Sequence, residues 1–276
     1  NLFGENAIVR PTYLSICNAD MRYYLGTRDA KVLAEKLPMA LIHEGVGEVF
    51  LDPTGTFKTG DKVVMVPNAP VEKDEFIAEN YLRSSKFCGS SMDGFLQEFV
   101  EISPKRLVKL PDDIDMTVAA FTEIVSVSVH AISRFDKIAH ARRNTISVWG
   151  DGNLGYITSL FLKYHFPKSK IVVFGTSSDK LADFTFADET HLVNEVPDGF
   201  TTDHAFECVG GNGSPIAIEQ IIGLIKPEGT ISILGVSEYP VPINTRMILE
   251  KGLRVFGSSR SGVKDFAKTV DMYKKH

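Results

Sequence analysis

Four residues with metal-binding side chains precede a glycine-rich loop in this 276-residue chain: Cys17, His43, Glu44 and Glu123. A cysteine, a histidine and carboxylates suit a catalytic Zn²⁺, whose site keeps one coordination position open. The loop, Trp149-Gly-Asp-Gly-Asn-Leu-Gly155, has the spacing of a nucleotide-binding turn. Each part alone is weak evidence, because single cysteines are usually core residues and histidines in loops are often solvated. In this order, the parts together predict zinc-assisted hydride transfer.

The glycine loop follows an expected strand and opens an expected helix, which is the context that dinucleotide binding requires. Gly150 permits the tight turn, Gly152 lets backbone N–H groups approach a pyrophosphate, and Gly155 lets helix and strand pack closely. A glycine turn with only a structural role is the alternative. We predict cofactor contacts from Gly150, Gly152, Asn153, Leu154 and Gly155.

The segment after the next expected strand, Gly175-Thr-Ser-Ser-Asp-Lys180, lacks the acid that usually accepts a hydrogen bond from the ribose 2′-OH of NAD. Space, hydroxyl donors and a cation suit a 2′-phosphate instead, so NADP is favoured over NAD. Two alternatives stay open: Ser177 or Ser178 caps a helix beside a solvated Lys180, or Asp179 is a displaced ribose partner. The predicted contacts are Gly175, Thr176, Ser177, Ser178 and Lys180.

The pattern of expected elements changes between the two halves of the chain. Short strands at 6–15, 45–51 and 94–100, separated by turns, predict a barrel-like β domain that ends in a helix from 118 to about 134. Strands at 145–149 and 170–174 flank a helix at 154–164, and this alternation predicts a parallel, doubly wound sheet. The fold class is therefore α/β.

We expect a catalytic domain over residues 1–136, a Rossmann domain over 137–262, and a helix over 263–276 that returns to the first domain. The first residues lack an initiator methionine and a signal-peptide pattern, and the last lie within an expected helix. Both observations predict that the chain is trimmed at its ends.

Composition excludes several classes of protein. A net charge of −5 without a lysine or arginine block argues against nucleic-acid binding. No apolar run approaches the roughly 20 residues of a membrane-spanning helix. Three widely separated cysteines, without a CxxC pair, argue against a disulfide framework and a four-cysteine structural zinc site. They indicate a reducing compartment, and we expect the cytoplasm.

The ordered motifs resemble the zinc-dependent medium-chain dehydrogenases/reductases, the superfamily of alcohol and polyol dehydrogenases. They are Cys17-x-x-Asp20, His43-Glu-Gly-x-Gly47, Phe57-x-x-Gly-Asp-x-Val63, Glu123 and the glycine loop. The resemblance implies a GroES-like β-barrel catalytic domain and a Rossmann domain. It implies Cys17, His43 and Glu123 as zinc ligands, with Glu44 binding zinc directly or through water. Asp20 would orient His43, although it could also begin a helix.

The chain departs from the superfamily pattern at three positions and in one segment. Ile42 replaces a glycine, Arg22 replaces a histidine of the proton relay, and Ala19 replaces a relay hydroxyl. Cys88 is the only cysteine between residues 71 and 92, so we expect no structural zinc. Glu44 is then the candidate relay residue, because Ala19 cannot carry a proton.

Longer segments, including Arg22-Tyr-Tyr-Leu-Gly-Thr-Arg28 and Phe256-Gly-Ser-Ser-Arg-Ser-Gly262, resemble the ribulose-5-phosphate reductases of bacterial CDP-ribitol synthesis. This resemblance implies NADPH-dependent reduction of the C2 ketone of D-ribulose 5-phosphate to D-ribitol 5-phosphate, pairing with a cytidylyltransferase for teichoic acid or capsule synthesis, and a homodimer or tetramer. A dehydrogenase of an unphosphorylated polyol or alcohol is the alternative. Arginine binds phosphate through a bidentate fork, and the candidate cations are Arg22, Arg28, Arg83 and Lys86.

Overall fold

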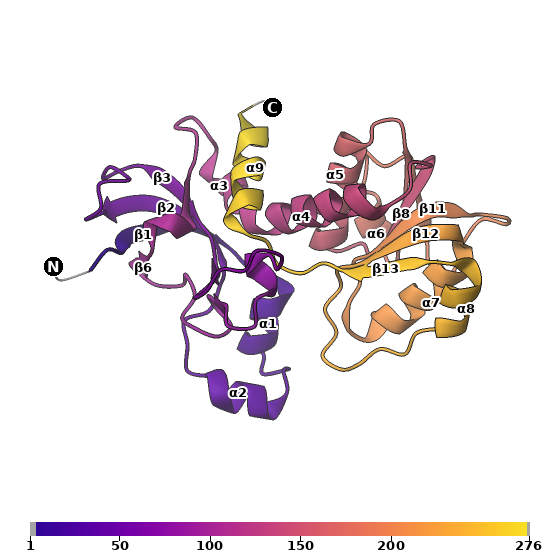
Figure 1. The fold of residues 1–276 in the computed structure, drawn as a ribbon, viewed down its shortest axis with the longest axis horizontal. Helices are drawn as coiled ribbons and strands as arrows, with labels where there is room; N and C mark the ends of the chain where they lie inside the picture. Colours follow the sequence, from indigo (N-terminus) through magenta and orange to yellow (C-terminus); the bar gives the residue numbers. More distant parts are fainter. Residues whose placement is uncertain (1–3, 275–276) are drawn as a thin grey trace. The chain divides into compact units, whose positions relative to one another are not determined.

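The computed structural model describes residues 4–274, whose contacts divide the chain into two compact units (Figure 1). One unit comprises Asn1–Val127 and Arg260–His276, and the other comprises Ser128–Ser259. The division falls inside the helix α4 (Thr122–Ile138). The domain boundaries expected after residues 136 and 262 remain predictions. No helix in the described part of the chain combines the length and apolar character that a membrane span needs.

The first unit contains an antiparallel five-stranded sheet in the order β6-β1-β2-β3-β7. Its strands are β1 (Ala7–Ser15), β2 (Glu44–Leu51), β3 (Lys62–Met65), β6 (Val100–Ile102) and β7 (Leu107–Lys109). A smaller antiparallel pair joins β4 (Asn68–Ala69) to β5 (Lys86–Phe87). The helices are α1 (Asn18–Tyr24), α2 (Ala30–Lys36), η1 (Glu79–Tyr81), η2 (Pro104–Arg106), α3 (Met116–Ala119), the start of α4, and α9 (Val263–Tyr273).

The pairing of β1 with β2 gives the first sheet its curvature. Its register shifts between Ile8 and Val9 and again between Pro11 and Tyr13, and such irregularities bend a strand and increase its twist. Gly47 faces this bend, because a Cβ there would lie 2.3 Å from the backbone oxygen of Arg10. The curved sheet encloses a core of Ala7, Val9, Val49, Val63, Met65, Phe95 and other buried apolar residues.

The second unit is a parallel six-stranded sheet in the order β10-β9-β8-β11-β12-β13. Counted from β8, this is the 3-2-1-4-5-6 order of the Rossmann fold. The strands are β8 (Thr145–Trp149), β9 (Lys170–Gly175), β10 (Glu189–Leu192), β11 (Thr202–Glu207), β12 (Ile225–Ile233) and β13 (Arg254–Gly257). The helices are the end of α4, α5 (Asn153–His165), α6 (Ser178–Leu181), η3 (Gly211–Gly213), α7 (Ser214–Leu224) and α8 (Thr245–Lys251).

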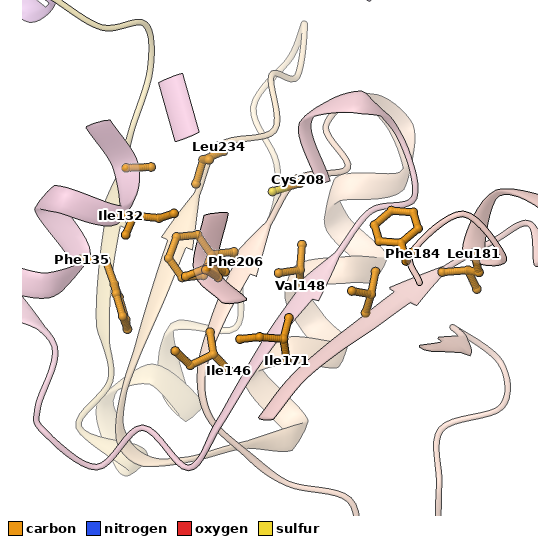
Figure 2. Packing of buried hydrophobic residues seen from close by; sticks show 13 residues of the cluster. Ile132, Phe135, Ile146, Val148, Ile171, Leu181, Phe184, Phe206, Cys208 and Leu234 are labelled. Carbon is orange, nitrogen blue, oxygen red and sulfur yellow. The ribbon is translucent and has the colours of Figure 1, made fainter. Parts of the chain in front are cut away.

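Apolar layers cover both faces of this sheet, because successive side chains of a strand point to opposite faces. Val148 and Phe206 lie in a cluster with Ile132 and Phe135 of α4, shown in Figure 2. Neighbouring strand residues, such as Trp149 and Ala205, belong to a second cluster with α7. The central strands are therefore buried on both faces, as is usual for a parallel sheet.

Two expected elements of the first unit differ in the structure. The helix expected from residue 118 is broken, since α3 ends at Ala119 and α4 begins at Thr122, whose hydroxyl donates to the Ala119 carbonyl at 2.6 Å. The strand expected over 94–100 forms only from Val100, because the amides of Gly94 and Phe95 donate instead to the carbonyls of Ala40 and Ile42. Both differences affect the candidate site: the break places Glu123 in the first turn of α4, and the irregular segment supports the loop before His43.

Candidate metal site and cofactor site

The pairing of β1 and β2 brings the first metal-binding side chains together. Ser15, the last residue of β1, pairs with Glu44, the first residue of β2. Cys17 follows β1 by two residues and His43 directly precedes β2, so the two lie at the same end of the antiparallel pair. Ligand atoms of Cys17, His43 and Glu44 all lie within 4.8 Å of one another. The fold thus gathers residues that are 26 positions apart in the chain.

The donor set fits a zinc ion. The Cys17 Sγ and the His43 Nε2 are 3.5 Å apart. With Zn–S near 2.3 Å, Zn–N near 2.0 Å and tetrahedral angles, two such ligands should be separated by about 3.6 Å. Soft thiolate, imidazole and carboxylate are the ligands that zinc takes in catalytic sites. That these residues bind zinc remains a prediction, which this geometry supports.

Asp20 holds both halves of the cluster. Its carboxylate accepts hydrogen bonds from the amide of Cys17 at 3.1 Å and the amide of Ile42 at 3.2 Å. The His43 Nδ1 lies 3.4 Å from the same carboxylate, opposite the Nε2 that faces Cys17. The alternative role as the N-cap of this helix is wrong, because α1 begins at Asn18 with Cys17 as its N-cap and Asp20 lies inside the first turn. A carboxylate so placed fixes the ring orientation of a metal-binding histidine.

The cluster is electrostatically coupled. Burial lowers the pKa of His43, but hydrogen bonds to Asp20 and Cys17 and the charge of Glu123 outweigh burial and raise the pKa to about 11. A zinc ion must therefore displace a tightly held proton from this imidazole. Burial raises the pKa of Glu44 and of Glu123, and the positive charge of His43 opposes both shifts. Glu123 thus lies close enough to act on His43, although it is outside the group of three within 4.8 Å.

Ile42, which departs from the glycine of the superfamily pattern, adopts a φ of 70°. This left-handed region of φ strains a β-branched residue but not a glycine. The backbone conformation therefore explains why the superfamily pattern has glycine at this position. Gly94 stabilises the loop by packing directly against it: a Cβ on Gly94 would lie 2.2 Å from the Ile42 oxygen and 2.4 Å from the Leu41 oxygen.

Gly94→Ala is expected to lower the free energy of unfolding by about 3 kcal/mol, because the added methyl group must displace backbone atoms rather than a flexible side chain. The displaced segment ends at His43, so the zinc content of the purified protein should also fall. Urea unfolding and elemental analysis measure the two effects. Gly223→Ala is the control, since a Cβ at Gly223 would meet nothing within 4 Å. Unchanged zinc content and stability in Gly94→Ala would contradict the predicted support role.

All four cations predicted for substrate phosphate belong to the first unit. Arg28 lies over the ring of Tyr23, with its guanidinium carbon 4.2 Å from the ring centre. Arg83 and Lys86 are exposed, and Arg22 is half-buried on α1. Their role in binding phosphate remains a prediction.

The glycine loop in the second unit has the close contacts expected of a phosphate-binding turn. Gly150 has a φ of 129° and follows β8, and Gly152 caps α5, which begins at Asn153. A Cβ on Gly155 would lie 2.0 Å from the Gly150 oxygen. Leu154 packs against the core of the unit. The turn can therefore present the N-terminus of α5 to an anion.

The segment after β9 is stabilised by an acid that the sequence interpretation missed. The Asp151 Oδ2 accepts from the amides of Thr176 and Ser177 at 2.7 and 2.8 Å. A Cβ on Gly175 would lie 2.7 Å from the Cβ of Asp151, so glycine is needed for this approach. Ser177 caps α6, with its side chain accepting from the amide of Lys180 at 3.4 Å. An acid inside the glycine loop, together with a glycine in place of the usual acid, was the signal available in the sequence.

A pocket of about 480 Å³ adjoins these residues. Lys180 is its one positively charged lining residue, beside the carboxylates of Asp151 and Asp183. The pocket is lined by Asp151, Gly152, Asn153, Tyr156, Lys180, Asp183 and Phe184.

Glu207, a second missed residue, stabilises the loops at the carboxyl end of the sheet. This fully buried side chain accepts hydrogen bonds from the amides of Val209, Gly210 and Gly235, at 3.1, 2.8 and 3.0 Å. Ligands of open parallel sheets bind at this edge. An acid at the end of an expected strand, with two glycines beginning three residues later, was the signal for it in the sequence.

Comparisons with known protein families agree with both units. Residues 4–112 match the alcohol dehydrogenase GroES-like domain, and residues 170–275 match the zinc-binding dehydrogenase family. A curved antiparallel sheet with a cysteine, histidine and glutamate cluster, followed by a Rossmann sheet, defines a zinc-dependent medium-chain dehydrogenase/reductase.

Similarity to characterised relatives is high over the whole chain. Ribulose-5-phosphate reductase 1 of Staphylococcus aureus is 58% identical over 273 residues, which cover 99% of this chain and 80% of that protein. The ribulose-5-phosphate reductase of Streptococcus pneumoniae is 48% identical over 269 residues, covering 97% and 78%. The chain belongs to the ribulose-5-phosphate reductase family of zinc-dependent medium-chain dehydrogenases.

Solved structures support the same placement. The crystal structure of S. aureus TarJ in complex with NADPH has a TM-score of 0.87 and 52% identity, covering all of this chain and 80% of that one. Galactitol-1-phosphate dehydrogenase from Escherichia coli, at 19% identity and a TM-score of 0.83, shares the fold. The expected GroES-like and Rossmann architecture is confirmed.

Proposed function

We propose that this protein reduces the C2 ketone of D-ribulose 5-phosphate to D-ribitol 5-phosphate, with NADPH as reductant and one zinc ion. The observation that carries the proposal is the 58% identity to a ribulose-5-phosphate reductase over 99% of the chain. The cluster of Cys17, His43 and Glu44 supports it, because it supplies the ligand chemistry that such a reduction needs.

Zinc would be held by Cys17, His43 and Glu123, with Glu44 binding directly or through water. When bound, zinc supplies Lewis-acid polarisation of a carbonyl oxygen, and NADPH supplies the hydride. Asp20 orients the imidazole of His43 and accepts hydrogen bonds from the backbone amides of Cys17 and Ile42. Glu44, which is buried and has a raised pKa, can hold a proton near the reacting oxygen. Ala19 has no hydroxyl, so Glu44 remains our candidate for the proton relay.

The cofactor would lie on the loop Gly150–Gly155 of the second unit, with the 2′-phosphate beside Lys180. The crystal structure of S. aureus TarJ is a complex with NADPH, which supports NADPH as the cofactor of this protein. Asp151 accepts two of the backbone amides in the segment after β9, and the cofactor contacts of Gly175, Thr176, Ser177 and Ser178 remain predictions. These residues would shape the pocket, and Lys180 would supply the charge.

Lys180→Ala is expected to raise the KM for NADPH about 10- to 30-fold, because an unpaired phosphate loses a charge-assisted contact. The KM for NADH should stay within about twofold, since NADH has no 2′-phosphate. Initial rates with both cofactors at several salt concentrations provide the measurement. Lys251→Ala, which removes a lysine that donates to three backbone carbonyls away from the pocket, is the control. An equal rise for both cofactors would show that Lys180 does not recognise the 2′-phosphate.

The proposed reaction is tested by NADPH oxidation by the zinc-loaded protein with D-ribulose 5-phosphate, alongside D-ribulose and with NADH replacing NADPH. Turnover that strongly favours the phosphorylated ketose and NADPH would support the proposal. Equal turnover of D-ribulose would favour a dehydrogenase of unphosphorylated polyols, and no turnover with bound zinc would exclude this substrate.

The cellular role that we propose follows the same resemblance. D-Ribitol 5-phosphate would pass to a cytidylyltransferase, and the resulting CDP-ribitol would supply teichoic acid or capsule synthesis. The thiols of Cys17, Cys88 and Cys208 are free, which supports a reducing compartment such as the cytoplasm. A homodimer or tetramer is the expected assembly, testable by light scattering.

A further inference from the structure

Arg260 stands out in the loop between β13 and α9, because it adopts a φ of 58°. In the described chain, the other residues besides glycine with positive φ are Ile42 and Glu228. A bulky residue enters this region only where surrounding contacts hold it there, and such residues concentrate at functional sites.

Contacts on both sides hold the loop in place. The Ser261 hydroxyl lies 2.6 Å from the hydroxyl of Ser126 on α4, which in turn donates to the carbonyl of Glu123. The amide of Val263 donates to Glu79 at 2.9 Å. Ser261, the residue after Arg260, is only 2% exposed. The loop is therefore both buried at this point and held by hydrogen bonds.

Glu79 is itself a rigid support. Both of its carboxylate oxygens accept from the guanidinium of Arg106, at 2.8 and 3.0 Å. A Cβ on Gly262 would lie 2.8 Å from Glu79, so glycine is required for the loop to pass this closely. The loop is therefore built to present Arg260 in one position.

The guanidinium of Arg260 lies beside the candidate metal site. Its carbon is 4.5 Å from the centre of the Phe87 ring, and that ring centre is 5.2 Å from the centre of the His43 ring. Stacking on an aromatic face leaves the edges of a guanidinium open to planar or tetrahedral anions. Burial lowers the pKa of Arg260, and the negative charge of Glu123 opposes this shift. Among the described residues, the two side chains form no ion pair within 4 Å.

Among the residues that the structure describes, Arg260 has no hydrogen-bond acceptor or ion-pair partner, although its side chain is half-buried. By contrast, the half-buried guanidiniums of Arg106 and Arg143 each donate to a carboxylate and to backbone carbonyls. A half-buried guanidinium with open donors is complementary to an anion.

We propose that Arg260 binds the phosphate of the substrate and so selects a sugar phosphate over the free sugar. This inference rests on the proposed function. In a pentulose 5-phosphate, the phosphate and the keto carbon lie toward opposite ends of the molecule. The phosphate-binding cation should therefore lie several ångströms from the metal ligands, which is where the shared contact with Phe87 places Arg260. Arg28, one of the four cations that the sequence suggested, lies over the ring of Tyr23 instead.

The test compares Arg260→Gln and Arg260→Lys with the wild-type, zinc-loaded protein. Calorimetry measures binding of D-ribitol 5-phosphate and of D-ribitol in the presence of NADP⁺, and initial rates give kcat/KM for D-ribulose 5-phosphate and D-ribulose. We expect Arg260→Gln to weaken binding of the phosphorylated polyol at least 30-fold and to change binding of D-ribitol less than threefold. Arg260→Lys should recover part of the loss. Arg246→Gln, which removes an exposed arginine paired with Glu250, is the control.

Several results would overturn the inference. Equal losses of affinity for the phosphorylated and the free sugar would show that Arg260 shapes the site without binding the phosphate. Loss of zinc from Arg260→Gln would show that Arg260 instead positions the metal ligand Glu123. Discrimination that survives in Arg260→Gln but disappears in Arg28→Gln would place the phosphate near Tyr23. Failure of the wild-type protein to reduce D-ribulose 5-phosphate would instead refute the proposed function. Calorimetry with D-ribitol 5-phosphate distinguishes failure of the phosphate-binding inference from failure of the proposed function, because it measures binding without turnover.

Discussion

Replacement of Cys17 by serine is expected to abolish stoichiometric zinc binding and to lower kcat/KM for D-ribulose 5-phosphate by about 1000-fold. The reason is the loss of the anionic sulfur: a serine hydroxyl stays protonated near neutral pH and is a poor zinc ligand, whereas a thiolate binds zinc strongly. The Cys17 Sγ, 3.5 Å from the His43 Nε2, is placed as one of a pair of ligands. Elemental analysis and steady-state rates measure the two effects.

Cys88→Ser is the matched control for this substitution. Cys88 is buried in the core of the same unit and is outside the metal cluster. Its replacement should cost some stability but leave zinc content and turnover close to those of the wild type. If Cys17→Ser kept a full equivalent of zinc and normal turnover, Cys17 would not be a ligand, and the proposed metal site would have to be rebuilt around other residues.

The second large effect is expected for Gly155→Ala, which should weaken NADPH binding by about 100-fold while zinc content stays unchanged. A Cβ at this position would lie 2.0 Å from the oxygen and 2.8 Å from the carbonyl carbon of Gly150. Gly150 cannot move away from the added methyl group, because it packs against the backbone of Cys208: a Cβ on Gly150 would lie 2.9 Å from the Cys208 carbonyl. The shifted loop would misplace the amides and the helix N-terminus that should receive the pyrophosphate.

Fluorescence titration with NADPH provides the measurement, and Gly223→Ala provides the control. Gly223 lies within α7, where a Cβ would meet nothing within 4 Å, so alanine should be neutral or slightly stabilising. NADPH affinity within about threefold of wild type in Gly155→Ala would indicate that the cofactor does not bind on this loop. A parallel loss of zinc would show that the substitution disturbs the whole fold.

Much of the fold was predictable because its signals are local. Alternating strands and helices around residues 145–174 predicted the parallel sheet, and the apolar strand residues form layers on both of its faces. The broken helix before Glu123 was not predictable in the same way, since the apolar spacing continues across the break. The strand expected from residue 94 does not form for a similar reason: its first amides donate to carbonyls 54 and 53 residues earlier, at Ala40 and Ile42, and no local sequence pattern indicates such a contact.

The sequence by itself determined the chemistry: the types and order of Cys17, His43, Glu44 and Glu123, and the glycine loop, indicate a zinc and nucleotide enzyme. Only the tertiary structure decided which side chains meet. Residue type limits which ligands and charges are possible, but contact between residues far apart in the chain depends on backbone pairing. Thus the pairing of β1 with β2 places Cys17 against His43. In the same way, the loop before α9, which hydrogen bonds hold in place, positions Arg260 over Phe87. No sequence motif predicted this contact.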